Sequence, residues 1–322
     1  MSEPILAADL PPHVRRPVLG YAMVLAATVL WGINGSLAKA ALSSGLSSLR
    51  LTEVRSTGAA VILVGALAIA RPKTLRITRG ELPFLLLFGV AGLAFVQLFY
   101  FVAINRLEIG VALLIQYVAP VLIALWARLV LKEPVRRRVW AALILALGGL
   151  SLVVDLWSGV ALDGLGVLAA LASAVTFALY ILLAESAVTR RDPVSLLALG
   201  FAFAALFWAV VQPWWSFPTE YLDDRVSLDG ALVSATLSVW ALLVGVVLVG
   251  TIVPFLLLLG ALRHLSATRA GVTAMFEPVA GAIVAYALLG ESLAGQQLVG
   301  GAIVLAGILL AQTAREDEIS AR

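Results

Sequence analysis

The sequence predicts an all-α integral membrane protein, in which ten transmembrane helices form two inverted five-helix repeats around a central cavity. Three observations lead to this prediction. The composition, 62% hydrophobic and 13% charged with a mean hydropathy of +1.05, is typical of a chain in a lipid bilayer. Apolar runs recur at lengths near the roughly 20 residues that cross a membrane. One long stretch occurs twice, which indicates an internal duplication.

Ten apolar runs divide the chain. They lie at about 18–38, 51–70, 82–104, 109–131, 139–156, 165–187, 194–213, 232–260, 270–289 and 295–313. The first run exceeds the roughly 7 to 15 residues of a signal-peptide core, so we expect it to be retained as a span. Residues 1–17 and 315–322 are then expected to be polar tails.

The duplication is clearest where residues 265–291 overlie residues 107–133 without a gap, at an offset of 158 positions and with eight identities in 27. A proline in mid-run, followed thirteen residues later by a glutamate, is rare in apolar segments. Both occur in each copy: Pro120 and Glu133, Pro278 and Glu291.

A weaker echo covers the start of each copy, where residues 20–38 overlie residues 166–184 at an offset of 146. This alignment sets Trp31 over Phe177 and Asn34 over Tyr180, while Gly92 matches Gly250 at the later offset of 158. Because each half contains five runs, an odd number, the second copy must enter the membrane from the opposite side. We therefore expect inverted repeats at 18–157 and 158–314.

The basic residues are distributed unevenly between the two sides. With a cytoplasmic N-terminus, 17 of the 22 Lys and Arg residues fall in the inner segments, whereas the outer connection at 214–230 is acidic. Cytoplasmic segments of membrane proteins carry this positive excess. The sequence therefore predicts a multi-pass protein of the inner (plasma) membrane with both termini in the cytoplasm, and the charge of +3 needs no nucleic-acid partner.

Enzyme chemistry has few candidate residues here. Cysteine is absent, the two histidines do not form a metal motif, and no phosphate-binding loop occurs. We therefore expect no catalytic site, metal or cofactor, and partners limited to membrane lipid and a small-molecule substrate. The oligomeric state stays open, and a monomer is plausible.

These features resemble the drug/metabolite transporter superfamily, in its ten-helix branch with duplicated EamA-type domains. The resemblance covers residues 18–313 and rests on Trp31 and Gly32, Arg55, residues 116–120 with Lys132 and Glu133, and residues 277–279 with Gly290 and Glu291. It implies a secondary active transporter that exports amino acids, including aromatic or other neutral ones, or similar small metabolites by alternating access. Export of another metabolite or a drug cation, and a membrane sensor or scaffold, are the alternatives.

Three prolines lie away from the ends of the apolar runs: Pro120, Pro254 and Pro278. Each removes a helical hydrogen bond and frees a carbonyl four residues earlier, which lipid does not satisfy. These positions are candidates for helix breaks or gating at the bilayer midplane. The alternative is that they only bend helices for packing.

Polar and aromatic side chains inside the runs are the candidates for substrate binding. They are Trp31, Asn34, Gln97, Tyr100, Gln116, Tyr117, Tyr180 and Thr251. Lining of one cavity and hydrogen bonding between helices, at roughly 0.6 kcal/mol per bond, both account for them.

Two charged residues inside the runs have different expected roles. An ionised Glu277 near the bilayer centre costs roughly 2.5 to 3.5 kcal/mol, so it should meet water, a partner or a proton. One hypothesis is that it binds a substrate amine or exchanges a proton during export. The alternative is that a protonated or paired Glu277 holds its helix against a neighbour. Arg55 lies one turn inside its run and is expected to snorkel to the outer surface, with contact to a substrate carboxylate as the second interpretation.

Glycine pairs at 148–149 and 300–301 are expected to let helices approach closely.

Overall fold

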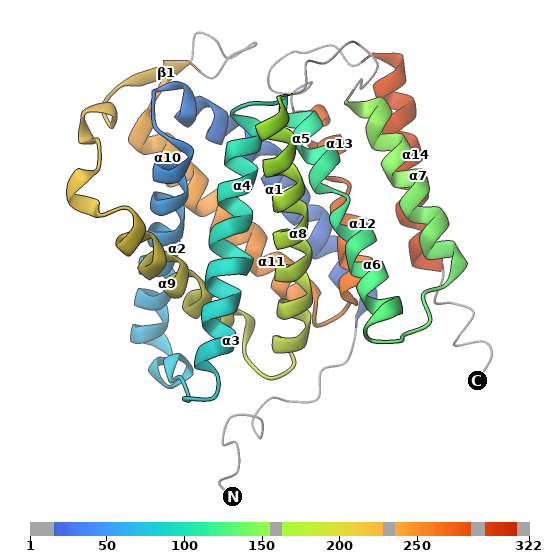
Figure 1. The fold of residues 1–322 in the computed structure, drawn as a ribbon, viewed down its shortest axis with the longest axis horizontal. Helices are drawn as coiled ribbons and strands as arrows, with labels where there is room; N and C mark the ends of the chain where they lie inside the picture. The colour runs from blue at the N-terminus through green and yellow to red at the C-terminus, as the bar shows by residue number, and fades with distance from the viewer. Residues whose placement is uncertain (1–15, 155–162, 228–235, 285–293, 314–322) are drawn as a thin grey trace, which may run out of the picture.

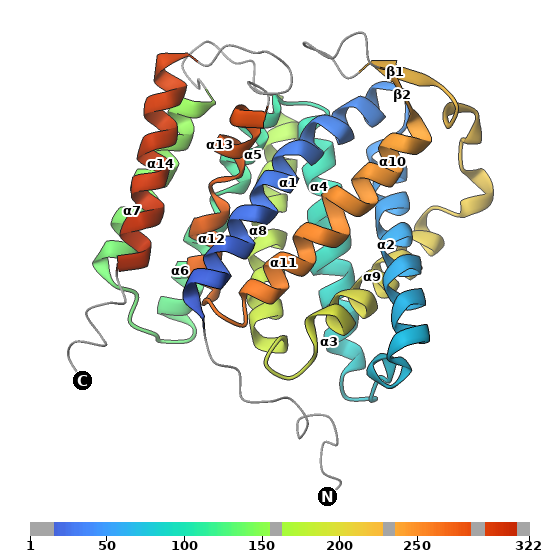
Figure 2. The same ribbon diagram turned by 180° about the vertical axis from the view of Figure 1, so that it is seen from behind.

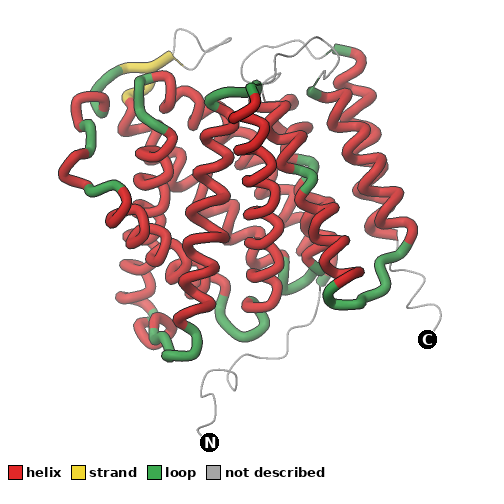
Figure 3. Tube along the Cα trace, in the orientation of Figure 1, coloured by secondary structure: helices red, strands yellow, loops and turns green. Residues whose placement is uncertain are grey.

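The computed structural model describes residues 16–154, 163–227, 236–284 and 294–313, which form a helical bundle (Figure 1) with short connections (Figure 3). The helices of the first half are α1 (Pro17–Ser43), α2 (Ser48–Ala70), α3 (Leu82–Leu87), α4 (Phe95–Ile104), α5 (Ile109–Gln116), α6 (Ala119–Leu129) and α7 (Arg137–Val153). Those of the second half are α8 (Gly164–Ala187), α9 (Pro193–Val211), α10 (Val239–Val247), α11 (Val253–Ala261), α12 (Ala267–Ala274), α13 (Glu277–Val284) and α14 (Gly295–Thr313).

Short elements complete the fold. Two π-helical turns, η2 (Phe88–Ala94) and η6 (Leu248–Ile252), join α3 to α4 and α10 to α11. Within the described ranges, three 3₁₀ turns lie in connections: η1 (Pro72–Leu75), η3 (Trp214–Ser216) and η4 (Thr219–Tyr221). The strands β1 (Arg225–Ser227) and β2 (Thr236–Ser238) pair antiparallel. The all-α prediction missed this hairpin, and the helix predicted from residue 232 begins at Val239, because residues 236–238 form the strand that precedes it.

Among the described residues, seven helical stretches are long and apolar enough to cross a membrane, which confirms a multi-span membrane protein. They are Pro17–Ser43, Ser48–Ala70, Leu82–Ile104, Ile109–Leu129, Gly164–Ala187, Pro193–Val211 and Val239–Ala261. The shorter apolar stretch Gly295–Ala311 lies in α14. Helix α7 lies at the run predicted for 139–156, and α12 with α13 lies at the run predicted for 270–289, whose end, with Glu291, is outside the described residues.

The two ends of the bundle are distinguished by the elements found there. Helix α1 begins and α14 ends at the same end, the lower one in Figure 1, which we call the terminal end. The β1–β2 hairpin lies at the opposite end, which we call the hairpin end.

Helices α7 and α14 lie side by side at one flank of the bundle in both views (Figure 2). They pack through the predicted glycines: a Cβ on Gly149 would lie 2.7 Å from the carbonyl oxygen of Gly300, and a Cβ on Gly300 would lie 2.6 Å from that of Gly149. Gly148 has no atom within 4 Å of such a Cβ. The helices are antiparallel, because Gly307 lies against Ala142 and Ala146, one to two turns back along α7.

Two of the predicted spans are broken in the middle. Helix α5 ends at Gln116 and α6 begins at Ala119, while α12 ends at Ala274 and α13 begins at Glu277. Pro120 and Pro278 are each the second residue of the new helix, where a missing N–H removes no helical bond. These prolines therefore start new helices and do not bend continuous ones. Pro254 likewise follows the π-helical turn η6 near the start of α11.

Contacts between the halves recur with the roles of the halves exchanged. Gly20 in α1 lies against Leu265, and Gly166 in α8 lies against Leu107. In the sequence alignment, Gly20 overlies Gly166 and Leu107 overlies Leu265. In the same way Gly92 lies against Tyr180, while Gly250 lies against Asn34. These two pairs of contacts are thus related by the repeat.

Helices α2 and α9 are joined at each end by a different buried arginine. At the hairpin end, Arg50 in α2 pairs with Glu53 at 2.7 Å and donates to the carbonyl oxygen of Ser216, also at 2.7 Å, beyond the end of α9. At the terminal end, Arg191 before α9 donates to the carbonyl oxygens of Thr74 and Arg76, beyond the end of α2. These bonds hold the loop after α9 against the start of α2, and the loop after α2 against the start of α9.

Replacing Arg191 with alanine is expected to release the connection at 71–81, because its two carbonyl acceptors lose a charged donor. Burial lowers the pKa of Arg191, and nearby Glu81 acts in the opposite direction, so the guanidinium remains the charged partner of this loop. Trypsin cleavage of the purified protein in this connection should become about tenfold faster. The neighbouring, exposed Arg190→Ala variant is the control, and equal cleavage in both variants would contradict the role of Arg191.

Candidate functional site

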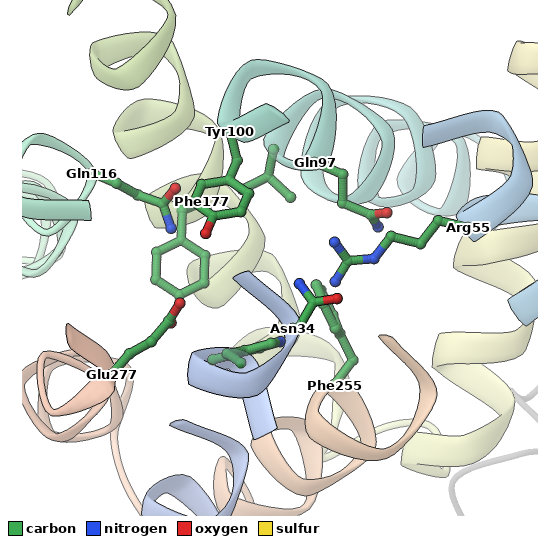
Figure 4. A pocket seen from close by; sticks show the side chains of 10 residues that line it. Asn34, Arg55, Gln97, Tyr100, Gln116, Phe177, Phe255 and Glu277 are labelled. Atoms are coloured by element: carbon green, nitrogen blue, oxygen red, sulfur yellow. The ribbon is translucent and has the colours of Figure 1, made fainter. Parts of the chain in front are cut away.

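A pocket of about 40 Å³ lies in the centre of the bundle, between helices of both halves (Figure 4). Its lining residues come from α1, α2, α4, α5, α8, α11 and α13: Trp31, Asn34, Arg55, Val96, Gln97, Tyr100, Gln116, Phe177, Phe255 and Glu277. The volume holds one or two waters, so a solute of amino-acid size would require the pocket to widen.

The structure brings six of the predicted binding residues to this pocket: Trp31, Asn34, Gln97, Tyr100, Gln116 and Glu277. The other three are buried but do not line it. Tyr117 lies in the break between α5 and α6, Tyr180 lies in α8, and Thr251 lies in the η6 turn. Of the three prolines, Pro278 lines a neighbouring cavity, whereas Pro120 and Pro254 are buried at the starts of their helices.

Arg55 does not snorkel to the surface, contrary to the favoured interpretation of the sequence. Its side chain points into the pocket and the residue is only 3% exposed. It donates hydrogen bonds to the carbonyl oxygen of Gly250 and to the Thr251 hydroxyl. The Gly250 carbonyl is the one that Pro254 leaves without a helical donor. The π-helical turn thus supplies acceptors that solvate a buried guanidinium, with the ring of Phe101 5.2 Å from its central carbon.

Glu277 is the first residue of α13 and reaches the far side of the pocket from Arg55 (Figure 4). The Tyr117 hydroxyl donates to its Oε2 at 2.6 Å. Both residues are supplied by the helix breaks, and a helix N-terminus favours a carboxylate. The pocket therefore has a cationic group on one side and an acidic group on the other.

Several buried polar atoms around the pocket have no hydrogen-bond partner among the described residues. They are Asn34 Oδ1, both amide atoms of Gln97 and the hydroxyl of Tyr100. The Tyr180 hydroxyl also has no partner among these residues, but it does not line the pocket. Gln116 differs, because it accepts from Ser173 at 2.7 Å. Buried polar atoms are normally paired, so unpaired donors and acceptors at one cavity indicate that water or a polar solute occupies it.

Aromatic rings complete the walls. Trp31 packs edge-on against Phe177 and Phe255, with ring centroids 6.2 and 5.5 Å apart. The two phenylalanines were not among the predicted site residues. Phe177 overlies Trp31 in the repeat alignment, and that correspondence was the signal that could have found it. For Phe255 and Val96, apolar residues in apolar helices, the sequence offers no comparable signal.

Two larger cavities lie on either side of this pocket. A cavity of about 600 Å³ at the hairpin end shares the lining residues Trp31, Tyr100 and Glu277 with the pocket and so adjoins it. A cavity of about 170 Å³ at the terminal end is lined by parts of α6, α7, α8 and α12. Of these two cavities, the larger one at the hairpin end is therefore the one that adjoins the pocket.

A buried polar pocket between helices that are long and apolar enough to cross a membrane is typical of a membrane transporter. The chain belongs to the EamA-like transporter family, whose model matches residues 18–155 and again 164–313.

One curated protein and one solved structure are similar to this chain over most of its length. An uncharacterized inner membrane transporter, YicL of Salmonella typhimurium, is 24% identical over 271 residues, which are 83% of this chain and 86% of that protein. The crystal structure of another protein shares the fold with a TM-score of 0.72 at 20% identity, over 94% of this chain and 99% of that one. The similarity to YicL supports an inner-membrane location for this multi-span chain.

Proposed function

We propose that the protein is a secondary active transporter that exports amino acids, especially aromatic or other neutral ones, across the cytoplasmic membrane. The observation that carries this proposal is the placement of Arg55 and Glu277 on opposite sides of one buried pocket. A guanidinium binds a carboxylate, and a carboxylate binds an ammonium group. A zwitterion carries both groups, so the pocket matches its two charges at once.

The remaining walls match the rest of such a solute. Trp31, Phe177 and Phe255 offer an apolar surface for a neutral or aromatic side chain. The unpaired atoms of Asn34 and Gln97 supply acceptors and donors beside the charged groups. A drug cation would use Glu277 but would leave Arg55 without an anionic partner, which favours the zwitterion over this alternative.

We infer that the architecture consists of ten spans in two inverted repeats, at 18–157 and 158–314, that operate by alternating access. The exchanged contacts between the halves support this arrangement, as do the antiparallel packing of α7 with α14 and the two matching helix breaks. The unequal cavities at the two ends support one open and one closed access path. With the termini in the cytoplasm, the hairpin end faces outward and this conformation is open to the outside.

The proposal is tested by efflux from reconstituted vesicles that are preloaded with a panel of solutes, at several pH gradients. The panel contains neutral, aromatic, acidic and basic amino acids, the amines that lack their carboxylate, and an organic cation. We expect the fastest efflux for neutral or aromatic amino acids. Fastest efflux of the cation would favour a drug exporter, and no flux of any solute would favour a sensor or scaffold.

Replacing Glu277 with glutamine is expected to lower amino-acid efflux by at least about tenfold, because the ammonium group loses a charged partner. The amide still accepts a hydrogen bond from Tyr117, so the fold should be retained. If Glu277 also carries a proton during transport, the dependence of flux on the pH gradient should flatten in this variant. An unchanged pH profile would contradict the proton role, and an unchanged rate would contradict binding.

A further inference from the structure

The cavities at the two ends of the bundle are counterparts in the repeat. At the hairpin end the cavity is lined by Ser36 and Lys39 of α1, and by Glu108 and Ile109 at the start of α5. The corresponding positions in the second copy line the cavity at the terminal end: Leu182 and Glu185 of α8, and Ser266 and Ala267 at the start of α12. Equivalent positions, on the first helix of a copy and at the start of its broken span, thus line a cavity at each end. The contacts between these positions differ between the two ends.

At the terminal end the two sets of positions are joined by a hydrogen bond. Glu185 Oε1 accepts a hydrogen bond from the backbone N–H of Ala267 at 2.8 Å. Ala267 is the first residue of α12, where backbone donors are free and the helix dipole favours a carboxylate. The bond ties α8 in the second copy to α12, the first half of the broken span that presents Glu277. Here the cavity measures about 170 Å³.

At the hairpin end the corresponding residues are apart. Lys39 and Glu108 are both exposed at the cavity of about 600 Å³, and neither side chain has a hydrogen bond or ion pair among the described residues. Glu108 is the residue that precedes α5, and its side chain does not cap that helix. The ammonium of Lys39 and this carboxylate have opposite charges, and they lie on the first-copy counterparts of α8 and α12, the helices that are bonded at the terminal end.

We propose that these residues form two gates. The bond from α12 to Glu185 closes the terminal end in the conformation described here, and an ion pair between Lys39 and Glu108 closes the hairpin end when the terminal end opens. The inference rests on the proposed alternating-access function, and it assigns the residues that hold each state. Each gate connects the first helix of one copy to the broken span of the same copy, so closing a gate displaces the helix break beside the pocket.

The first test measures access to each cavity. The chain has no cysteine, so single cysteines introduced as Ser36→Cys and Thr268→Cys report on the hairpin-end and terminal-end cavities with a water-soluble thiol reagent. Adding Glu185→Ala should raise labelling at position 268 and lower labelling at position 36, each by about tenfold. The reason is that the conformation with a closed terminal end loses a charge-assisted hydrogen bond. Ser186→Ala, an exposed neighbour whose hydroxyl bonds only to the carbonyl oxygen of Leu183, is the matched control and should change neither.

The second test exchanges charges at the gate that is open here. Lys39→Glu and Glu108→Lys should each slow amino-acid efflux by about tenfold, and the double variant should restore at least half of the rate, because the pair is rebuilt with reversed charges. A double variant as slow as the single ones, or Glu185→Ala labelling equal to that of Ser186→Ala, would overturn the gates while wild-type efflux persists. If the wild-type protein transports no solute of the panel, the proposed function fails first, so the two failures are distinguishable.

Discussion

Replacing Arg55 with alanine is expected to lower efflux of a neutral amino acid by roughly 10- to 150-fold, the range for loss of a hydrogen bond to a charged group. The physical reason is that the pocket would keep its acid, Glu277, but lose the group that holds the carboxylate. The same variant should also lose its preference for the amino acid over the amine that lacks the carboxylate. Competition between the two solutes in vesicle efflux measures this change in specificity.

Arg55→Lys is the matched variant, because it keeps the positive charge but loses the planar guanidinium. The guanidinium bonds Gly250 and Thr251 and still has a further N–H for a solute carboxylate. We expect an intermediate rate and a retained preference for the amino acid. Thermal unfolding of both variants controls for folding, since Arg55 is buried against Phe101. An alanine variant that is folded and still prefers the amino acid would exclude Arg55 as the carboxylate-binding residue.

Replacing Gly149 with leucine is expected to destabilise the fold by more than about 3 kcal/mol, because its first side-chain atom would already overlap the backbone of α14. Leucine has no alternative rotamer that avoids a backbone contact made by its Cβ. The separation of α7 from α14 would follow, with a loss of the folded protein in detergent. The midpoint of thermal unfolding, followed by tryptophan fluorescence, measures the effect.

The adjacent Gly148→Leu variant is the control for this prediction, since Gly148 faces away from α14 with open space around it. It should change stability by no more than about 0.5 kcal/mol. Because both variants add the same side chain to the same helix, composition and helix propensity cancel. Equal unfolding midpoints would contradict the close packing of α7 and α14.

The two halves share the contacts of their frame but not the charged residues of the pocket. Contacts that build the frame, such as Gly20 with Leu265 and Gly166 with Leu107, occur in both halves. The acid of the pocket does not, because Glu277 overlies Ala119 in the first copy. A symmetric frame can open at either end with similar energy, whereas a zwitterion has two different ends and needs different residues at the two sides of its site.

The sequence was most informative where a physical constraint acts along the chain itself. The need to cross a bilayer predicted the helical membrane class, and the recurring prolines predicted where helices α5–α6 and α12–α13 are interrupted. Polar residues are costly in apolar runs, so Asn34, Gln97 and Glu277 stood out as pocket residues before the structure placed them there.

The sequence was least informative where a residue's environment comes from another helix. Arg55 was expected at the surface because a snorkelling side chain needs only its own helix. The structure instead provides the Gly250 carbonyl and the Thr251 hydroxyl, about 195 residues further along the chain. The sequence by itself determined the membrane class, the duplication and the helix breaks, since each is a property of local composition or spacing. Only the tertiary structure decided the direction of Arg55, the pocket it shares with Glu277 and the end at which the larger adjoining cavity lies, because these depend on which helices pack together.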